Sequence, residues 1–158
     1  ALAKNILDIC KSYDVPCILH TYWKVALELG HDSIHLPLPL LRELSAESQN
    51  HLQSQNSTIS QSFHVTDFHK IGTSVHSVED AMEAERLGAT YVTAGHIFTT
   101  DCKKGLPPRG LDFLKNVCDA VTIPVYGIGG IKFDPQQWNI LKKQGACGGC
   151  IMSGMMQL

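Results

Sequence analysis

Short apolar segments alternate with helical patterns along most of the chain, and this alternation limits its fold more than any other feature. Strand-like runs are predicted at residues 17–20, 33–36, 70–75, from 91 onward, at 123–130 and at 150–152. Helical spacing separates them, at residues 1–13, 23–29, 77–87, 111–121 and 135–144. Such alternation predicts an α/β fold with a parallel sheet, either open and doubly wound or closed into a barrel.

One long stretch departs from this pattern. Residues 43–62 are rich in serine, glutamine and asparagine and show little apolar periodicity. A segment of this composition has few side chains to bury, so we predict an exposed connection there. Whether it is ordered is left open by the sequence.

Composition places the chain among soluble globular domains and points to small-molecule partners. The 158 residues are 44% hydrophobic and 18% charged, with a formal net charge of −2. This predicts one domain over residues 1–158 with a sizeable core. The charge gives no general attraction to nucleic acid or an anionic membrane, and no apolar run approaches the ~20 residues that span a bilayer. We therefore expect a cytoplasmic protein. The sequence is compatible with either a monomer or a homo-oligomer.

Six cysteines lie mostly within apolar, periodic segments, which indicates reduced thiols and not a disulfide framework. Cys147 and Cys150 have the spacing of a redox or zinc pair, but no second pair follows them, and burial explains them better. The histidines outside the central strand are too scattered to indicate a metal site. The sequence thus predicts no cofactor.

The stretch Tyr91–Gly110 begins as a strand and ends as a basic loop rich in glycine and proline. Ligands of parallel sheets bind at the carboxyl ends of the strands, so His96, Thr100, Cys102 and Lys103 are candidates for a site. Imidazole titrates near neutrality and can transfer protons, although a hydrogen-bonded structural histidine is the competing interpretation of His96. The basic loop suits an anionic small molecule.

Two later strands end in glycine-containing turns. Gly129 and Gly130 follow one predicted strand, and Ser153 and Gly154 follow the next. Neighbouring turns of this kind can bind phosphate through backbone N–H groups, as they do after the last two strands of a (β/α)₈ barrel. The turn at 127–130 lacks the third glycine of a dinucleotide-binding fingerprint. We predict one phosphate site built from both turns.

Five segments together resemble the thiamine phosphate synthase and TenI family, and TenI in particular: GTSVHS at 72–77, AGHIFTTDCKKG at 94–105, RGL at 109–111, IPVYGIGGI at 123–131 and IMSG at 151–154. The resemblance implies a (β/α)₈ TIM barrel. On that layout the predicted strands correspond to the third through the eighth, with the first two βα units absent from a chain that begins inside a helix. The whole of 1–158 would then be one such domain.

The resemblance also implies a choice between two activities. Synthases of this family join a thiazole phosphate to a pyrimidine diphosphate and hold magnesium with acidic residues after the third and fourth strands. Here His20, Thr21, Leu38 and Leu40 stand at those positions, and leucine cannot bind a hard cation. The resemblance to TenI therefore favours an isomerase, a thiazole tautomerase of thiamine biosynthesis that needs no metal.

In that interpretation His96 is the catalytic acid and base acting on a small-molecule thiazole phosphate. Substrate binding is assigned to the residues of the strand ends and turns, namely Ser74, Thr100, Lys103, Gly129, Gly130, Ser153 and Gly154. The alternatives are a thiamine phosphate synthase, which is a transferase, and a non-catalytic regulatory or ligand-binding protein of the TenI type. A cysteine hydrolase using Cys102 and His96 lacks a third, orienting group.

Overall fold

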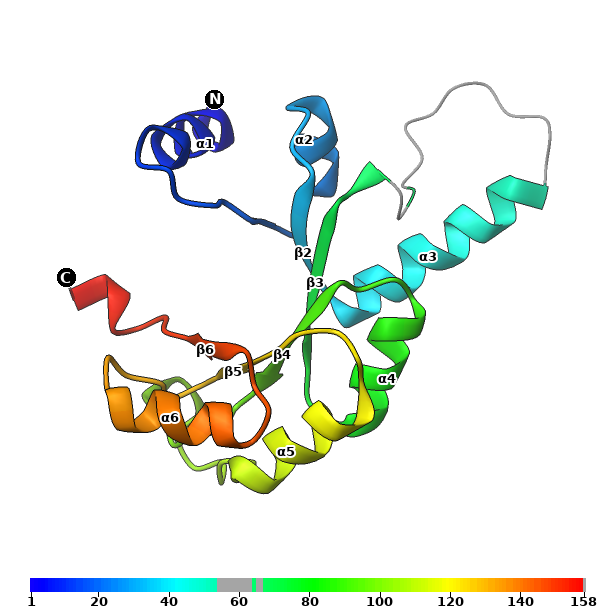
Figure 1. Cartoon of the computed structure of the whole chain (residues 1–158). Coiled ribbons are helices and arrows are strands. Elements are labelled where there is room, and N and C mark those ends of the chain that lie inside the picture. Colours follow the sequence, from blue (N-terminus) through cyan, green and yellow to red (C-terminus); the bar gives the residue numbers. More distant parts are fainter. Residues whose placement is uncertain (54–63, 65–66, 158) are drawn as a thin grey trace. The chain divides into compact units, whose positions relative to one another are not determined.

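The computed structural model of the chain describes residues 1–53, 64 and 67–157, and it divides into two compact units (Figure 1). The N-terminal unit is Ala1–Gly72 and the C-terminal unit is Thr73–Leu158. Strand β3, Lys70–Val75, crosses the boundary between them.

The N-terminal unit contains two short parallel strands with helices after each. Its elements are α1 (Leu2–Ser12), β1 (Leu19–His20), α2 (Trp23–Glu28), β2 (Ser33–Pro37) and α3 (Leu38–Gln53). Leu19 pairs with Ile34 and His20 with His35. Helices α2 and α3 pack on these strands. The core of the unit is formed by aliphatic side chains from β2, α2 and the first turns of α3.

Helix α3 corrects the prediction for residues 43–62. Residues up to Gln53 are helical and not an irregular connection, while residues 54–62 lie outside the described part of the chain. Leu38, Leu41 and Leu44 are buried, and their spacing of three residues places them on one face of the helix. Pro39 lies in the first turn, where a missing N–H costs no helical hydrogen bond. The prediction was wrong because a few leucines suffice to anchor a helix of otherwise polar composition.

The C-terminal unit is a regular βα layer structure. Its elements are the second half of β3, α4 (Val78–Arg86), β4 (Tyr91–Gly95), the 3₁₀ turn η2 (Asp101–Lys103), α5 (Gly110–Ala120), β5 (Val125–Ile128), α6 (Pro135–Lys143), β6 (Gly148–Cys150) and η3 (Met155–Gln157). Strand β5 pairs in parallel with β4 on one side and β6 on the other. Helices α4, α5 and α6 cover one face of these strands (Figure 1).

Local sequence explains the boundaries of the helices in this unit. The hydroxyl of Ser77 accepts a hydrogen bond from the backbone N–H of Asp80 at 3.0 Å and so caps α4. Asp134 caps α6 in the same way, with Pro135 at the first helical position. Gly88 follows α4 with a φ of 92°, a conformation that glycine adopts without strain. The strands between these helices end at one edge, where the site is found.

The α/β class and the alternation predicted from the sequence are confirmed. All six predicted strands are present among the described residues, although β1 is shorter than predicted and β6 lies two residues earlier in the chain. That residues 1–158 act as one domain stays a prediction. Within the described ranges, no helix is both long and apolar enough to cross a lipid bilayer.

Candidate functional site

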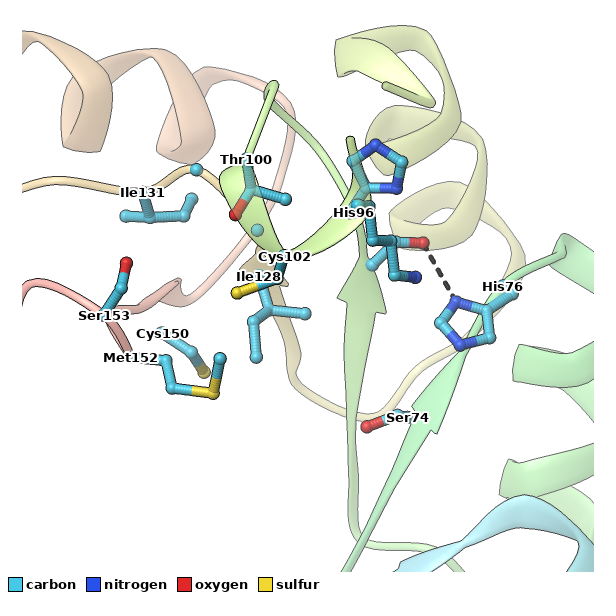
Figure 2. Close-up of a pocket in the computed structure, with 14 residues that line it drawn as sticks. Ser74, His76, His96, Thr100, Cys102, Ile128, Ile131, Cys150, Met152 and Ser153 are labelled. Atoms are coloured by element: carbon cyan, nitrogen blue, oxygen red, sulfur yellow. Dashed lines mark hydrogen bonds between the residues drawn. The ribbon is translucent and has the colours of Figure 1, made fainter. Parts of the chain in front are cut away.

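The carboxyl ends of four strands of the C-terminal unit surround a cavity of about 220 Å³. Ser74 and His76 come from β3 and the turn after it, and Thr100 and Lys103 come from the loop after β4. The turns after β5 and β6 complete the wall (Figure 2). This is the location that the strand-end rule for parallel sheets predicts.

The structure brings the predicted site residues together. The cavity is lined by seven of them, namely Ser74, His96, Thr100, Lys103, Gly129, Gly130 and Ser153. Gly154 lines an adjoining, wider hollow that Thr100, Gly130 and Ser153 also border. The two glycine-containing turns are therefore neighbours, as a single phosphate site requires.

Glycine is needed at positions 129 and 130 for a structural reason, apart from any ligand. The backbone after β4 lies directly against it, with the N–H of Ile97 donating to the carbonyl of Ile128 and that of Phe98 to the carbonyl of Gly129, each at 2.9 Å. A Cβ atom on Gly129 would meet the Cβ of His96 at 2.6 Å. Both glycines also have positive φ. Glycine is thus needed so that the loop after β4 can approach this closely.

His96 is buried at the end of β4, with 5% of its surface exposed. Its carbonyl accepts a hydrogen bond from the N–H of Arg109 at 3.0 Å, which ties the returning end of the loop to β4. Its Nε2 atom is buried and has no hydrogen-bond partner in the described part of the chain. In Figure 2 the imidazole points away from Ser74, Met152 and Cys150. The side chain is therefore badly placed to transfer protons to a ligand among those residues.

A second histidine lies at the cavity. His76, which is not among the predicted site residues, lines the wall, and its Nδ1 atom is 3.1 Å from the carbonyl oxygen of Gly95. The signal that could have identified it is the same strand-end rule, because His76 directly follows β3. The rule thus points to His76 as well as to Ser74 at this strand end.

The middle of the cavity is apolar and contains two thiols. Ile128, Ile131 and Met152 contribute hydrocarbon and thioether surface, and Cys102 and Cys150 face the same space. Burial raises the pKa of the Cys150 thiol, which keeps it protonated and unreactive. Cys102 lies on the exposed turn η2. Lys103 provides the positive charge of the wall, and Ser74 shares a 2.9 Å hydrogen bond with the hydroxyl of Thr93.

The positions where synthases of the family hold magnesium do not fit a hard cation here. Thr21 follows β1, and its hydroxyl is 2.6 Å from Nδ1 of His20. Leu38 is buried at the start of α3, and Leu40 is in the same turn. No group of three or more His, Cys, Asp or Glu side chains that could hold a metal ion occurs among the described residues. Magnesium prefers carboxylate and other oxygen ligands, so this donor set does not suit it.

Comparisons with known proteins identify the family. The model of the thiamine monophosphate synthase family matches residues 1–155. The chain belongs to this family. It is 32% identical to thiamine-phosphate synthase of Clostridium acetobutylicum over 98% of its own length and 65% of that protein. With thiamine-phosphate synthase of Listeria monocytogenes it shares 36% identity over 82% of its length and 55% of the relative.

Solved structures give the same result for the fold. Thiamine phosphate pyrophosphorylase from Pyrococcus furiosus is 28% identical, with a TM-score of 0.67 over 96% of this chain and 64% of that one. The YdjI aldolase from Escherichia coli, at 16% identity and a TM-score of 0.63, is similar in fold alone. The predicted barrel type is confirmed, since the chain corresponds to part of a (β/α)₈ barrel. It spans between 55% and 65% of the length of these relatives.

The family predicted from the sequence motifs is confirmed, but the predicted activity is wrong. The relatives are named thiamine-phosphate synthase and not tautomerase, which contradicts an isomerase. The argument for the isomerase rested on the missing carboxylates at residues 20, 21, 38 and 40 and on His96 facing a ligand. In the structure its ring is buried and points away from Ser74, Met152 and Cys150 (Figure 2). The synthase, weighed as the alternative, agrees better with the comparisons.

Proposed function

We propose that this protein is a thiamine-phosphate synthase, a transferase that joins a thiazole phosphate to a pyrimidine diphosphate. The observation that carries the proposal is the single cavity at which Lys103, Thr100 and both glycine-containing turns meet. The names of the relatives support the same conclusion. The substrates would be small phosphorylated molecules.

The two ends of the phosphate-binding wall would serve different anions. Gly129, Gly130, Ser153 and Gly154 would hold the monophosphate of the thiazole, because turn N–H groups and a hydroxyl donate hydrogen bonds to phosphate oxygens. Lys103 and Thr100 would hold the diphosphate. The joining of the two heterocycles releases diphosphate, and a lysine at the departing group stabilises its developing charge.

The residues between these anion sites suit the heterocycles. Ile128, Ile131 and Met152 form an apolar wall against which flat rings can pack. A dry wall also keeps water from the reacting carbon, which favours transfer to the thiazole over hydrolysis. No step is assigned to magnesium, because the expected ligand positions lack carboxylates. His96 has a positioning role in this proposal, through the backbone hydrogen bond that closes the loop.

The test is formation of thiamine phosphate from the two substrates, followed by chromatography, for the chain and two lysine variants. Lys103→Ala removes the charge at the leaving diphosphate, and we expect kcat/KM to fall by about 10²-fold or more. Lys104→Ala is the matched control, because Lys104 is the next residue and is exposed outside the cavity. Absence of product with the unmodified chain, or equal rates for the two variants, would overturn the proposal.

A further inference from the structure

His76 lines the cavity, and one hydrogen bond defines the tautomer of its ring. The carbonyl oxygen of Gly95, 3.1 Å from Nδ1, can only accept a hydrogen bond, so Nδ1 carries the proton. In the neutral ring Nε2 then has the lone pair and acts as an acceptor. The backbone of β4 thus selects the tautomer of a side chain that belongs to the turn after β3.

The ring is held from both sides. The backbone N–H of His76 donates to the Asp80 carboxylate at 3.1 Å, and the N–H of Asp80 donates to Ser77, which fixes the turn before α4. On the other side, a Cβ on Gly95 would be 3.6 Å from Cε1 of His76, an ordinary van der Waals distance, so the ring lies close against the end of β4. A side chain fixed at its backbone and at one ring nitrogen is preorganised for binding.

The position of His76 relative to the glycine-containing turns defines which part of a ligand it can reach. In Figure 2, His76 and Ser74 lie on one side of the lining residues, and Ser153 and Ile131 lie on the opposite side. A phosphate held at the turns therefore leaves the rest of the ligand to extend toward His76. His96 differs, because its ring is buried and points away from Ser74 and Met152.

We propose that His76 is a further binding residue of this site, whose Nε2 accepts a hydrogen bond from an N–H group on the heterocyclic end of the ligand. The identity of that ligand as a thiamine precursor or product rests on the function proposed above. The proposed contact is to the heterocycle and not to the phosphate. Its loss should weaken heterocyclic ligands and leave inorganic phosphate unaffected.

The experiment is calorimetric titration of the chain with thiamine phosphate and, separately, with inorganic phosphate. His76→Ala should weaken thiamine phosphate binding about tenfold, the value of one hydrogen bond, with phosphate binding unchanged. His76→Gln places an amide oxygen near the position of Nε2 and should recover most of the affinity. His69→Ala replaces an exposed histidine away from the cavity and should match the unmodified chain.

The outcomes separate this inference from the proposed function. If His76→Ala binds thiamine phosphate normally, or loses phosphate and thiamine phosphate equally, the hydrogen bond to the heterocycle is refuted, even where thiamine phosphate is synthesised. If binding depends on His76 but no synthesis is detected, the inference stands and the transferase proposal fails. Failure of the unmodified chain to bind thiamine phosphate overturns both.

Discussion

The two units use histidine and the ends of their strands in opposite ways. In the N-terminal unit, His20 and His35 stack with ring centroids 5.1 Å apart, and the residues after the strands are hydrophobic or form a strained turn. In the C-terminal unit, the strand ends supply a lysine, hydroxyls and an imidazole to one cavity. The same residue type is thus a packing element in one unit and a wall of the site in the other.

The difference lies in how the loops after the strands are held. After β4, backbone hydrogen bonds from Ile97 and Phe98 to the β5 turn and from Arg109 back to His96 fix both ends of the loop. In the same unit, one oxygen of Glu85 accepts hydrogen bonds from the backbone and hydroxyl of Thr122, which holds the turn before β5. A loop fixed in this way can present side chains at defined positions, which binding and catalysis require.

The largest effect that tests this comparison is expected for Gly130→Ala. A Cβ at Gly130 would meet the Cβ of Phe98 at 2.8 Å and the carbonyl oxygen of Thr99 more closely still, at a residue with a φ of 69°. We expect a loss of roughly 3–5 kcal/mol in unfolding free energy, because neither backbone segment can move without breaking the paired loop. Urea denaturation followed by circular dichroism measures it.

Gly30→Ala is the matched control in the N-terminal unit. Gly30 has a φ of 63°, but a Cβ there would have no atom within 4 Å. Its cost should be only that of the left-handed conformation, about 1–2 kcal/mol. Equal losses for the two variants would contradict the claim that close approach of the loop, and not conformation alone, requires glycine at 130.

The second effect concerns pH and the stacked histidines of the N-terminal unit. Burial, with a smaller contribution from the charge of His20, lowers the pKa of His35 from 6.5 to about 4. The unfolded chain therefore binds this proton at a higher pH than the folded one. Stability is fully present above pH 6.5 and is lost as the pH falls from 6.5 through about 4. The loss should be on the order of 2 kcal/mol.

Thermal unfolding measured from pH 7.5 to 4.5 tests this prediction. His35→Leu fills the buried position without a titratable group and should flatten the acid limb of the profile. His69→Ala removes an exposed histidine and should leave the profile unchanged. An unaltered acid limb in His35→Leu would show that the acid loss arises elsewhere.

Most of the fold could be predicted from sequence because its strands are short apolar runs closed by glycine or proline. Residues 70–75 and 135–143 match their predicted elements almost to the residue. Helix α3 could not be predicted in this way, because Leu41 and Leu44 are its few buried anchors among polar residues. Periodicity measures how many apolar side chains repeat and not how deeply a few of them are buried.

The location of the site could also be predicted, but not the orientation of each side chain in it. The strand-end rule correctly placed Lys103, Thr100 and the glycine-containing turns at one cavity. It could not show that β4 ends at Gly95 and that the next residue turns its ring away. Side-chain direction alternates along a strand, so its last residue must be known before the direction of the following residue can be assigned.

The smallest effect concerns the ends of the N-terminal strands. Thr21 has a φ of 71°, which is unfavourable for a β-branched residue and better tolerated by asparagine or aspartate. Thr21→Asp would place a carboxylate where synthases of the family have one. The unmodified chain, without an oxygen donor set there, should show no stabilisation by millimolar Mg²⁺ in the absence of substrate.

Both Thr21→Asn and Thr21→Asp should gain a few tenths of a kcal/mol from the more favourable backbone conformation. Only Thr21→Asp should show a further gain with Mg²⁺, again a few tenths of a kcal/mol, because one carboxylate binds the ion weakly. Differential scanning calorimetry with Mg²⁺ and with an equal ionic strength of Na⁺ separates binding from screening.

Mg²⁺-specific stabilisation of the unmodified chain would show that the N-terminal unit contains a metal site. The contrast between the two units would then no longer hold. A gain with Mg²⁺ confined to Thr21→Asp would show that the N-terminal strand ends differ from a synthase metal site by their missing carboxylate, while the backbone there can still accept the ion.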